Sequence, residues 1–193
     1  MRKVCLLSGG PGVGKTTVIQ QALSNLKGKA GGFYTEEIRV GGRRHGFRLV
    51  TLEEGESAIL AHIDIKSPHR VSKYGVDIEG LDRVGVSALR QAIQECDLVV
   101  VDEIGKMELF SPAFRESVLE AINSGKRVLG TIMLSPHPWA DDIKRHPSVT
   151  LISLTRANRN QVLKQVVEWV QSDIMSRGQV EQDSAKKLNR QQG

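Results

Sequence analysis

The sequence predicts an α/β fold in which helices cover both faces of a mostly parallel central sheet. Apolar runs of four or five residues alternate with segments of helical period along the 193-residue chain, a pattern typical of this class. The most apolar run, Leu98–Val101, is mainly β-branched and is typical of a central strand covered on both faces. With 39% hydrophobic and 25% charged residues, the composition is that of an ordinary globular protein.

We expect one domain over residues 1–172, followed by a polar tail over residues 173–193 that is predicted to be disordered. The predicted strands of the main sheet cover residues 4–7, 98–101, 128–132 and 150–154, and the predicted helices cover residues 15–26, 84–95, 112–124 and 158–172. The third helix is expected to begin with Ser111 as N-cap and Pro112 as its first residue.

Between the first helix and the second, the pattern changes. Segments 33–40 and 46–52 are predicted to form an antiparallel hairpin, because Gly41 and Gly42 favour a tight connection between two strand-like runs. Loop-rich sequence follows, so the domain is expected to carry an insert over about residues 33–83.

Charge, cysteine content and hydropathy restrict the classes of partner. Of the net charge of +5, +2 falls on residues 176–193, and a dedicated nucleic-acid surface is not expected from the remainder. Cys5 and Cys96 are expected to be buried small hydrophobic residues rather than a disulfide or metal pair. The chain contains neither a signal peptide nor an apolar run of membrane-spanning length, so we expect a cytoplasmic protein, and a monomer.

Eight consecutive residues match the phosphate-binding pattern G-x-x-x-x-G-K-[ST] at every fixed position: Gly9, Gly10, Pro11, Gly12, Val13, Gly14, Lys15 and Thr16. The motif follows a predicted strand and opens a predicted helix, which is the context that it requires. Its glycines let successive backbone N–H groups point at phosphate oxygens. Lys15 is expected to contact the β- and γ-phosphates, and the Thr16 hydroxyl is expected to bind Mg²⁺.

A phosphate loop of this kind requires an acidic residue for magnesium at the end of a neighbouring strand. Asp102 directly follows the most apolar strand and is the candidate ligand. Glu103 is the candidate general base that polarises the attacking water, and a solvated surface carboxylate is its alternative interpretation. Glu108 is a second candidate for the base.

Other polar residues are candidates for the site because of where they stand relative to the predicted strands. Thr131 ends a predicted strand, where its hydroxyl either touches the γ-phosphate or attacking water or bonds to the backbone. Arg156 and Arg159 follow the last strand and are candidates for stabilising transition-state charge or stacking on the base, with exposed helix-terminus arginines as the alternative. Arg43 and Arg44, with the neighbouring histidine at the hairpin tip, either clamp a phosphate or second substrate or form a solvated turn.

Several of these segments together resemble a known family. They look like the small P-loop nucleoside-triphosphatases related to the thermophilic enzyme and to the human cancer-related NTPase: GGPGVGKTT at 9–17, GFYTEEIR at 32–39, GFRLVTL at 46–52, YGVD at 74–77, VDEIGKMELF at 101–110 and the pair Asn158-Arg159. The resemblance covers about residues 1–172 and implies a P-loop NTPase core, a three-layer sandwich with an inserted hairpin. It implies Mg²⁺-dependent hydrolysis of ATP, GTP and other nucleoside triphosphates to diphosphate and phosphate. It also adds further nucleotide-binding positions: Thr17, Ile104, Gly105, Lys106 and Met107.

Two other functions compete with this interpretation. One is a P-loop kinase that transfers the γ-phosphoryl group to a nucleotide, a small molecule or a nucleic-acid end, although the stretch 144–147 is a poor version of an arginine-rich lid. The other is a nucleotide-dependent switch, in which the loop 105–108 moves with the nucleotide state and a protein partner reads it. The sequence contains no N-K-x-D element for guanine, which favours loose base selection.

Overall fold

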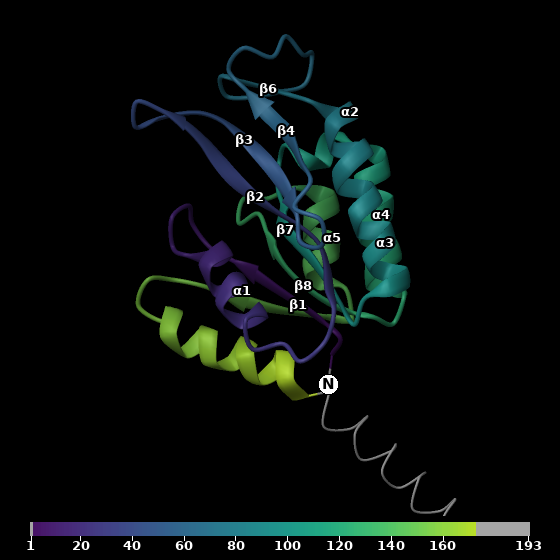
Figure 1. Ribbon diagram of the computed structural model, residues 1–193. Coiled ribbons are helices and arrows are strands. Elements are labelled where there is room, and N and C mark those ends of the chain that lie inside the picture. Colours follow the sequence, from purple (N-terminus) through teal and green to yellow (C-terminus); the bar gives the residue numbers. More distant parts are fainter. Residues whose placement is uncertain (1, 173–193) are drawn as a thin grey trace, which may run out of the picture.

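The computed structural model describes residues 2–172 and shows a three-layer α/β sandwich (Figure 1). Its strands are β1 Val4–Ser8, β2 Ala30–Val40, β3 Arg43–Thr51, β4 Ser57–His62, β5 Arg70–Val71, β6 Tyr74–Val76, β7 Leu98–Ile104, β8 Arg127–Ile132 and β9 Val149–Ser153. Its helices are α1 Lys15–Leu23, α2 Ile78–Gly80, α3 Ser87–Glu95, α4 Pro112–Asn123 and α5 Pro138–Arg145, with a π-helical turn at Leu81–Val86, a 3-10 turn at Glu108–Phe110 and a last helix over residues 159–172. The predicted disorder of residues 173–193 lies outside the described residues.

The strands form one sheet in the order β5-β6-β4-β3-β2-β7-β8-β1-β9. The five strands from β2 to β9 pair in parallel, so their carboxyl ends meet at one edge of the sheet. The remaining pairs are antiparallel. The predicted α/β fold with a parallel centre and an antiparallel hairpin is confirmed.

The hairpin is continuous with the central sheet. In the 11-residue strand β2, the first five residues, Ala30–Tyr34, pair in parallel with β7, and the residues from Phe33 to Val40 pair with β3. The strand therefore begins three residues before the expected hairpin strand. It carries the hairpin beyond the carboxyl edge of the sheet, on the side where the phosphate loop lies (Figure 1).

Several short elements were not expected from the sequence: strands β4, β5 and β6 and helices α2 and α5. Strand β4 lies in the stretch that was predicted to be loop-rich, and it buries only Ala58, Leu60 and Ala61. Helix α5 is eight residues long and buries only Ala140 and Ile143. Elements this short bury too few apolar residues to show a period in a mainly polar stretch, so tertiary packing decides their conformation.

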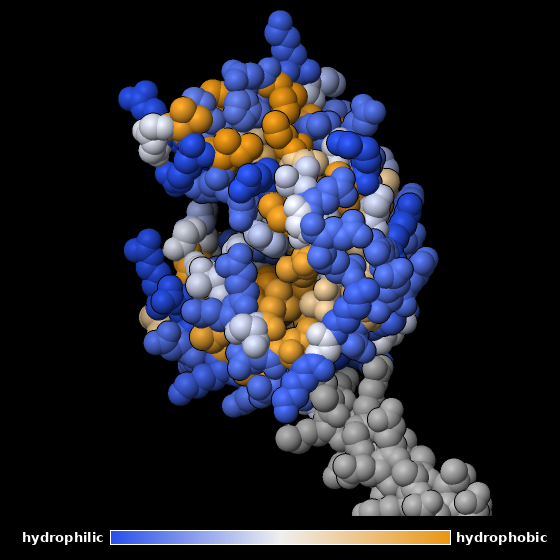
Figure 2. All heavy atoms as spheres, in the orientation of Figure 1, coloured by the Kyte–Doolittle hydropathy of each residue, from blue (hydrophilic) through white to orange (hydrophobic). Residues whose placement is uncertain are grey.

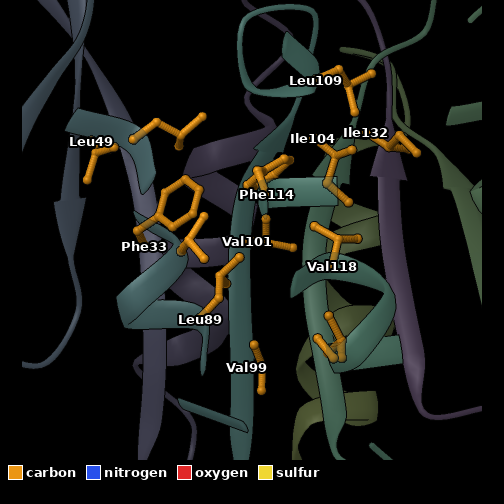
Figure 3. Close-up of a cluster of buried hydrophobic side chains, with 14 of the residues drawn as sticks. Phe33, Leu49, Leu89, Val99, Val101, Ile104, Leu109, Phe114, Val118 and Ile132 are labelled. Carbon is orange, nitrogen blue, oxygen red and sulfur yellow. The ribbon is translucent and has the colours of Figure 1, made fainter. Parts of the chain in front are cut away.

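The sheet separates two apolar layers. On one face, helices α3, α4 and α5 cover a core that includes Phe33, Leu89 and Phe114, and the rings of Phe33 and Phe114 lie 6.2 Å apart (Figure 3). On the other face, α1 and the last helix enclose a second core that includes Ile19 and Val166. Figure 1 shows α1 and this last helix lying together on their side of the sheet.

The predicted N-cap of α4 and the predicted burial of both cysteines are confirmed. The Ser111 hydroxyl accepts a hydrogen bond of 2.9 Å from the Phe114 N–H, which is the N-cap contact expected before Pro112. Cys5 and Cys96 are free and buried, and burial raises the pKa of their thiols to about 12 and about 11. None of the helices described over residues 2–172 combines the length and apolar character that a bilayer crossing needs.

Candidate active site

The phosphate loop connects β1 to α1 at the carboxyl edge of the sheet. Gly14 precedes the helix with φ 98°, a left-handed conformation that favours glycine, and the helix begins at Lys15. Gly9 approaches the chain after β9 so closely that a Cβ there would lie 2.4 Å from the Leu154 carbonyl oxygen. The loop is therefore held against the end of β9 and leads directly into a helix N-terminus, where backbone N–H groups favour an anion.

Lys15 bends back over the loop that it follows. Its ammonium donates a hydrogen bond of 3.0 Å to the Gly9 carbonyl oxygen and lies 3.8 Å from a carboxylate oxygen of Glu103. The side chain is mostly buried, with 12% of its surface exposed. The cation is thus fixed between the start of the loop and the end of β7, where the β- and γ-phosphates of a nucleotide are expected.

Asp102 was expected to follow the strand directly, but β7 includes it and continues to Ile104; the residue is 1% exposed. One of its carboxylate oxygens accepts a hydrogen bond of 2.5 Å from the Thr131 hydroxyl, and the other, Oδ2, has no hydrogen-bond partner among residues 2–172. Burial raises the pKa of Asp102, while the hydroxyls of Thr131 and Thr16 and the charge of Lys15 oppose that rise. A buried carboxylate oxygen without a partner, close to a cation and two hydroxyls, has the chemistry of a ligand for a hard metal ion.

Glu103 is half-buried beside Lys15, and the peptide bond that joins it to Asp102 is cis. Burial raises the pKa of Glu103; the Lys15 charge acts against this and the Asp102 charge adds to it. The carboxylate is therefore a better proton acceptor than a solvated glutamate. Its position next to the lysine brings together the two side chains that the sequence placed in catalytic roles.

Glu108 closes the loop that follows Glu103. Its carboxylate accepts hydrogen bonds from the N–H groups of Gly105 and of Glu108 itself, and it lies 2.9 Å from the place where a Gly105 Cβ would stand. Glu108 is 5% exposed, and burial is the main cause that raises its pKa to about 8. Through these hydrogen bonds, Glu108 stabilises the turn that follows Glu103.

The other positions of this loop differ in exposure. Ile104 is fully buried in the core opposite Ile132, Met107 packs partly against the same core, and Lys106 is exposed. Only Lys106 therefore presents a polar side chain to solvent beside the site.

Thr131 makes a contact that neither sequence interpretation named. Its hydroxyl bonds to the Asp102 carboxylate, because the two residues lie on the same face of neighbouring strands β7 and β8. Tyr34 of β2 pairs directly with Asp102 in the parallel register, so its side chain lies on that face too. Nothing in the sequence around Tyr34 indicates this position, since the parallel pairing of β2 with β7 gives no local signal.

The arginines divide between the two sides of the site. At the hairpin, Arg43 and Arg44 are both exposed, and Arg44 forms an ion pair with Glu37 and lies over the Phe47 ring. Arg156 is exposed in the chain that follows β9, and Arg159 packs on Gly14 of the phosphate loop. Figure 2 shows the surface hollowed between the hairpin and the phosphate loop.

We expect the stability of the nucleotide-free protein to depend on pH through Glu108. Its folded-state pKa of about 8 lies above the unfolded value of 4.5, so its contribution is fully present below pH 4.5 and is lost as the pH rises through 8. The free energy of unfolding should therefore fall by up to about 1.4 kcal/mol per pH unit between these values. Urea unfolding at pH 5 to 8 in EDTA should show a weaker fall for Glu108→Gln. Parallel curves for both proteins would show that Glu108 is ionised in the fold.

Comparisons with known proteins agree with this geometry. The sequence model of a family described as NTPase matches residues 4–167. The nucleoside-triphosphatase THEP1 of Thermotoga maritima is 49% identical over 162 residues, which cover 84% of this chain and 92% of the relative. The cancer-related nucleoside-triphosphatase of Homo sapiens is 38% identical, over 89% of this chain and 98% of the relative. The crystal structure of THEP1 from the hyperthermophile Aquifex aeolicus superposes with a TM-score of 0.79 at 34% identity, over 87% of this chain and 99% of that chain. The family resemblance inferred from the motifs is confirmed.

Proposed function

This chain belongs to the NTPase family and is a nucleoside-triphosphatase, and we propose that it hydrolyses the γ-phosphate with Mg²⁺ at Thr16 and Asp102 and with Glu103 as general base. The observation that carries this proposal is the convergence of Lys15, Asp102 and Glu103 at the mouth of the phosphate loop. The phosphate loop with Lys15 and the end of β7 with Asp102 and Glu103 come from two distant places in the sequence and meet at one edge of the sheet.

The residues present fit a magnesium ion. In the described part of the chain, the buried Oδ2 of Asp102 has no hydrogen-bond partner, and the Thr16 hydroxyl lies close enough to affect the pKa of that carboxyl group. Mg²⁺ favours a site of this kind, with one or two protein oxygens completed by phosphate oxygens and water. When bound, the ion neutralises negative charge on the β- and γ-phosphates.

The remaining work falls to the protein's own groups. The backbone N–H groups of the loop and the Lys15 ammonium bind and orient the phosphates. The Glu103 carboxylate accepts a proton from the attacking water, and its raised pKa makes it a stronger base than a solvated glutamate. Thr131 holds the Asp102 carboxylate in one orientation through the hydrogen bond of 2.5 Å.

We also propose the wider context of the enzyme. The single sheet that runs through residues 2–172 supports one domain over residues 1–172 with an insert over about residues 33–83. Two buried, free cysteines are in keeping with a cytoplasmic protein. We propose that it acts there as a monomer.

The metal assignment is tested with Asp102→Asn. We expect this variant to release phosphate at least about 100-fold more slowly than the wild type, because the neutral amide is a poorer magnesium ligand. It should also require more Mg²⁺ for half-maximal binding of ADP, measured by calorimetry across a Mg²⁺ titration. Asp142→Asn, at an exposed position of α5, is the matched control. Wild-type Mg²⁺ dependence in Asp102→Asn would refute the assignment.

A further inference from the structure

Arg159 lies against the phosphate loop although it is separated from it by more than 140 residues of sequence. If Gly14 had a Cβ, that atom would lie 3.0 Å from the Arg159 Cδ and 3.4 Å from its Nη1. The guanidinium therefore rests on the glycine that directly precedes Lys15. The absence of a side chain at Gly14 makes this approach possible.

The chain before Arg159 is tightly held. The Asn158 side chain accepts a hydrogen bond of 2.8 Å from the Thr155 N–H and donates one of 2.9 Å to the Ser153 carbonyl oxygen. The Asn158 N–H in turn donates to the Thr155 hydroxyl at 3.2 Å. Immediately afterwards the last helix buries Val162 and Val166 in the core shared with α1. The backbone of Arg159 is thus fixed relative to the phosphate loop.

Strand order decides which end of a nucleotide Arg159 faces. Strand β1, which leads into the loop, lies between β8 and β9. The groups proposed for the γ-phosphate, Asp102 and Glu103, belong to β7 beyond β8, and Lys15 points toward them. Arg159 follows β9, on the other side of β1. A triphosphate whose terminal phosphate lies at the β7 side must therefore leave the loop with its nucleoside at the β9 side.

A purely structural role does not account for Arg159. Within residues 2–172 its exposed guanidinium has neither an ion pair nor a hydrogen bond. It also stands in the first turn of a helix, where a cation is disfavoured by the helix dipole. The same guanidinium is planar, weakly hydrated and suited to stacking on aromatic faces.

We propose that Arg159 forms the nucleoside subsite of this enzyme by stacking its guanidinium on the base. The inference rests on the proposed function, because it takes the triphosphate to lie in the phosphate loop with its γ end at Glu103. Every nucleobase has a π face, so a stacking contact holds adenine, guanine, cytosine and uracil alike. The ligand class of the subsite is therefore any nucleoside di- or triphosphate, without selection by hydrogen bonds to the base edge.

The test compares ligands with and without a nucleoside, by equilibrium binding in the presence of Mg²⁺. Arg159→Ala is expected to weaken ADP, GDP, CDP and UDP each about tenfold and to leave the affinity for pyrophosphate unchanged. Arg159→Lys keeps the positive charge but lacks the planar guanidinium, and it should lose most of the affinity for nucleoside diphosphates that Arg159→Ala loses. Lys164→Ala removes an exposed cation from the same helix and should bind all five ligands as the wild type does. Thermal unfolding of each variant checks that the fold is retained.

Binding separates this proposal from the proposed hydrolysis, since it needs no turnover. Equal weakening of the diphosphates and of pyrophosphate in Arg159→Ala would show a phosphate contact and overturn the proposal. Unchanged affinity for all five ligands would show an idle surface residue and overturn it too. If the wild type binds nucleoside diphosphates more tightly than pyrophosphate but releases no phosphate from the triphosphates, the hydrolytic function fails while the subsite stands.

Discussion

Glu103→Gln is expected to bind Mg·ATP almost as the wild type does and to hydrolyse it at least about 100-fold more slowly. The amide keeps the shape of the side chain but cannot accept the proton of the attacking water, and general-base catalysis contributes about 10²–10⁴-fold to a rate. Ground-state binding rests on the loop backbone and on Lys15, which this change leaves in place. Single-turnover phosphate release and calorimetric binding of ATP measure the two quantities separately.

A matched control for Glu103→Gln is Glu116→Gln, at an exposed position of α4. It makes the same chemical change away from the site and should leave both binding and turnover unaltered. Turnover by Glu103→Gln within tenfold of the wild type would show that another group takes the proton. Glu108 is too buried to replace it without a rearrangement of its turn, because it is 5% exposed.

Lys15→Ala is expected to abolish measurable hydrolysis. The ammonium lies 3.0 Å from the Gly9 carbonyl oxygen and 3.8 Å from the Glu103 carboxylate, so its removal takes away both the phosphate charge contact and the cation next to the base. Loss of one donor to a developing negative charge costs about 10²–10³-fold in rate, and the affinity for triphosphate should fall as well. Steady-state kinetics over a wide ATP range measure both losses.

Lys27→Ala serves as the control, because it removes an exposed lysine beyond the end of α1. The phosphate loop itself should persist in Lys15→Ala, since Gly14 and the start of α1 do not depend on the ammonium. Wild-type activity in Lys15→Ala would mean that the nucleotide is bound elsewhere.

The parts of the fold that were predictable carry their signals locally. The phosphate loop, the strand before Asp102 and the Ser111 cap each depend on neighbouring residues, and the structure shows the strand, the turn and the cap where they were predicted. Elements β4 and α5 were missed because each buries only two or three apolar side chains.

The site was predictable only in part, because its contacts depend on strand order. Nothing local to Thr131 indicates that its hydroxyl bonds to Asp102, and nothing local to Tyr34 indicates that it lies beside that carboxylate. The sequence likewise left the role of Arg159 open between the phosphates and the base. The position of β9 places this arginine on the side of β1 away from Asp102 and Glu103, where we propose that the nucleoside lies.

The most direct test of the account is phosphate release by the purified wild-type protein from ATP, GTP, CTP and UTP, with Mg²⁺ and without any acceptor. We expect release from all four, ending at the nucleoside diphosphate and stopping when EDTA removes the metal. A protein that stays inert with all four until an acceptor is added would contradict the account, because Glu103 would then not be activating water.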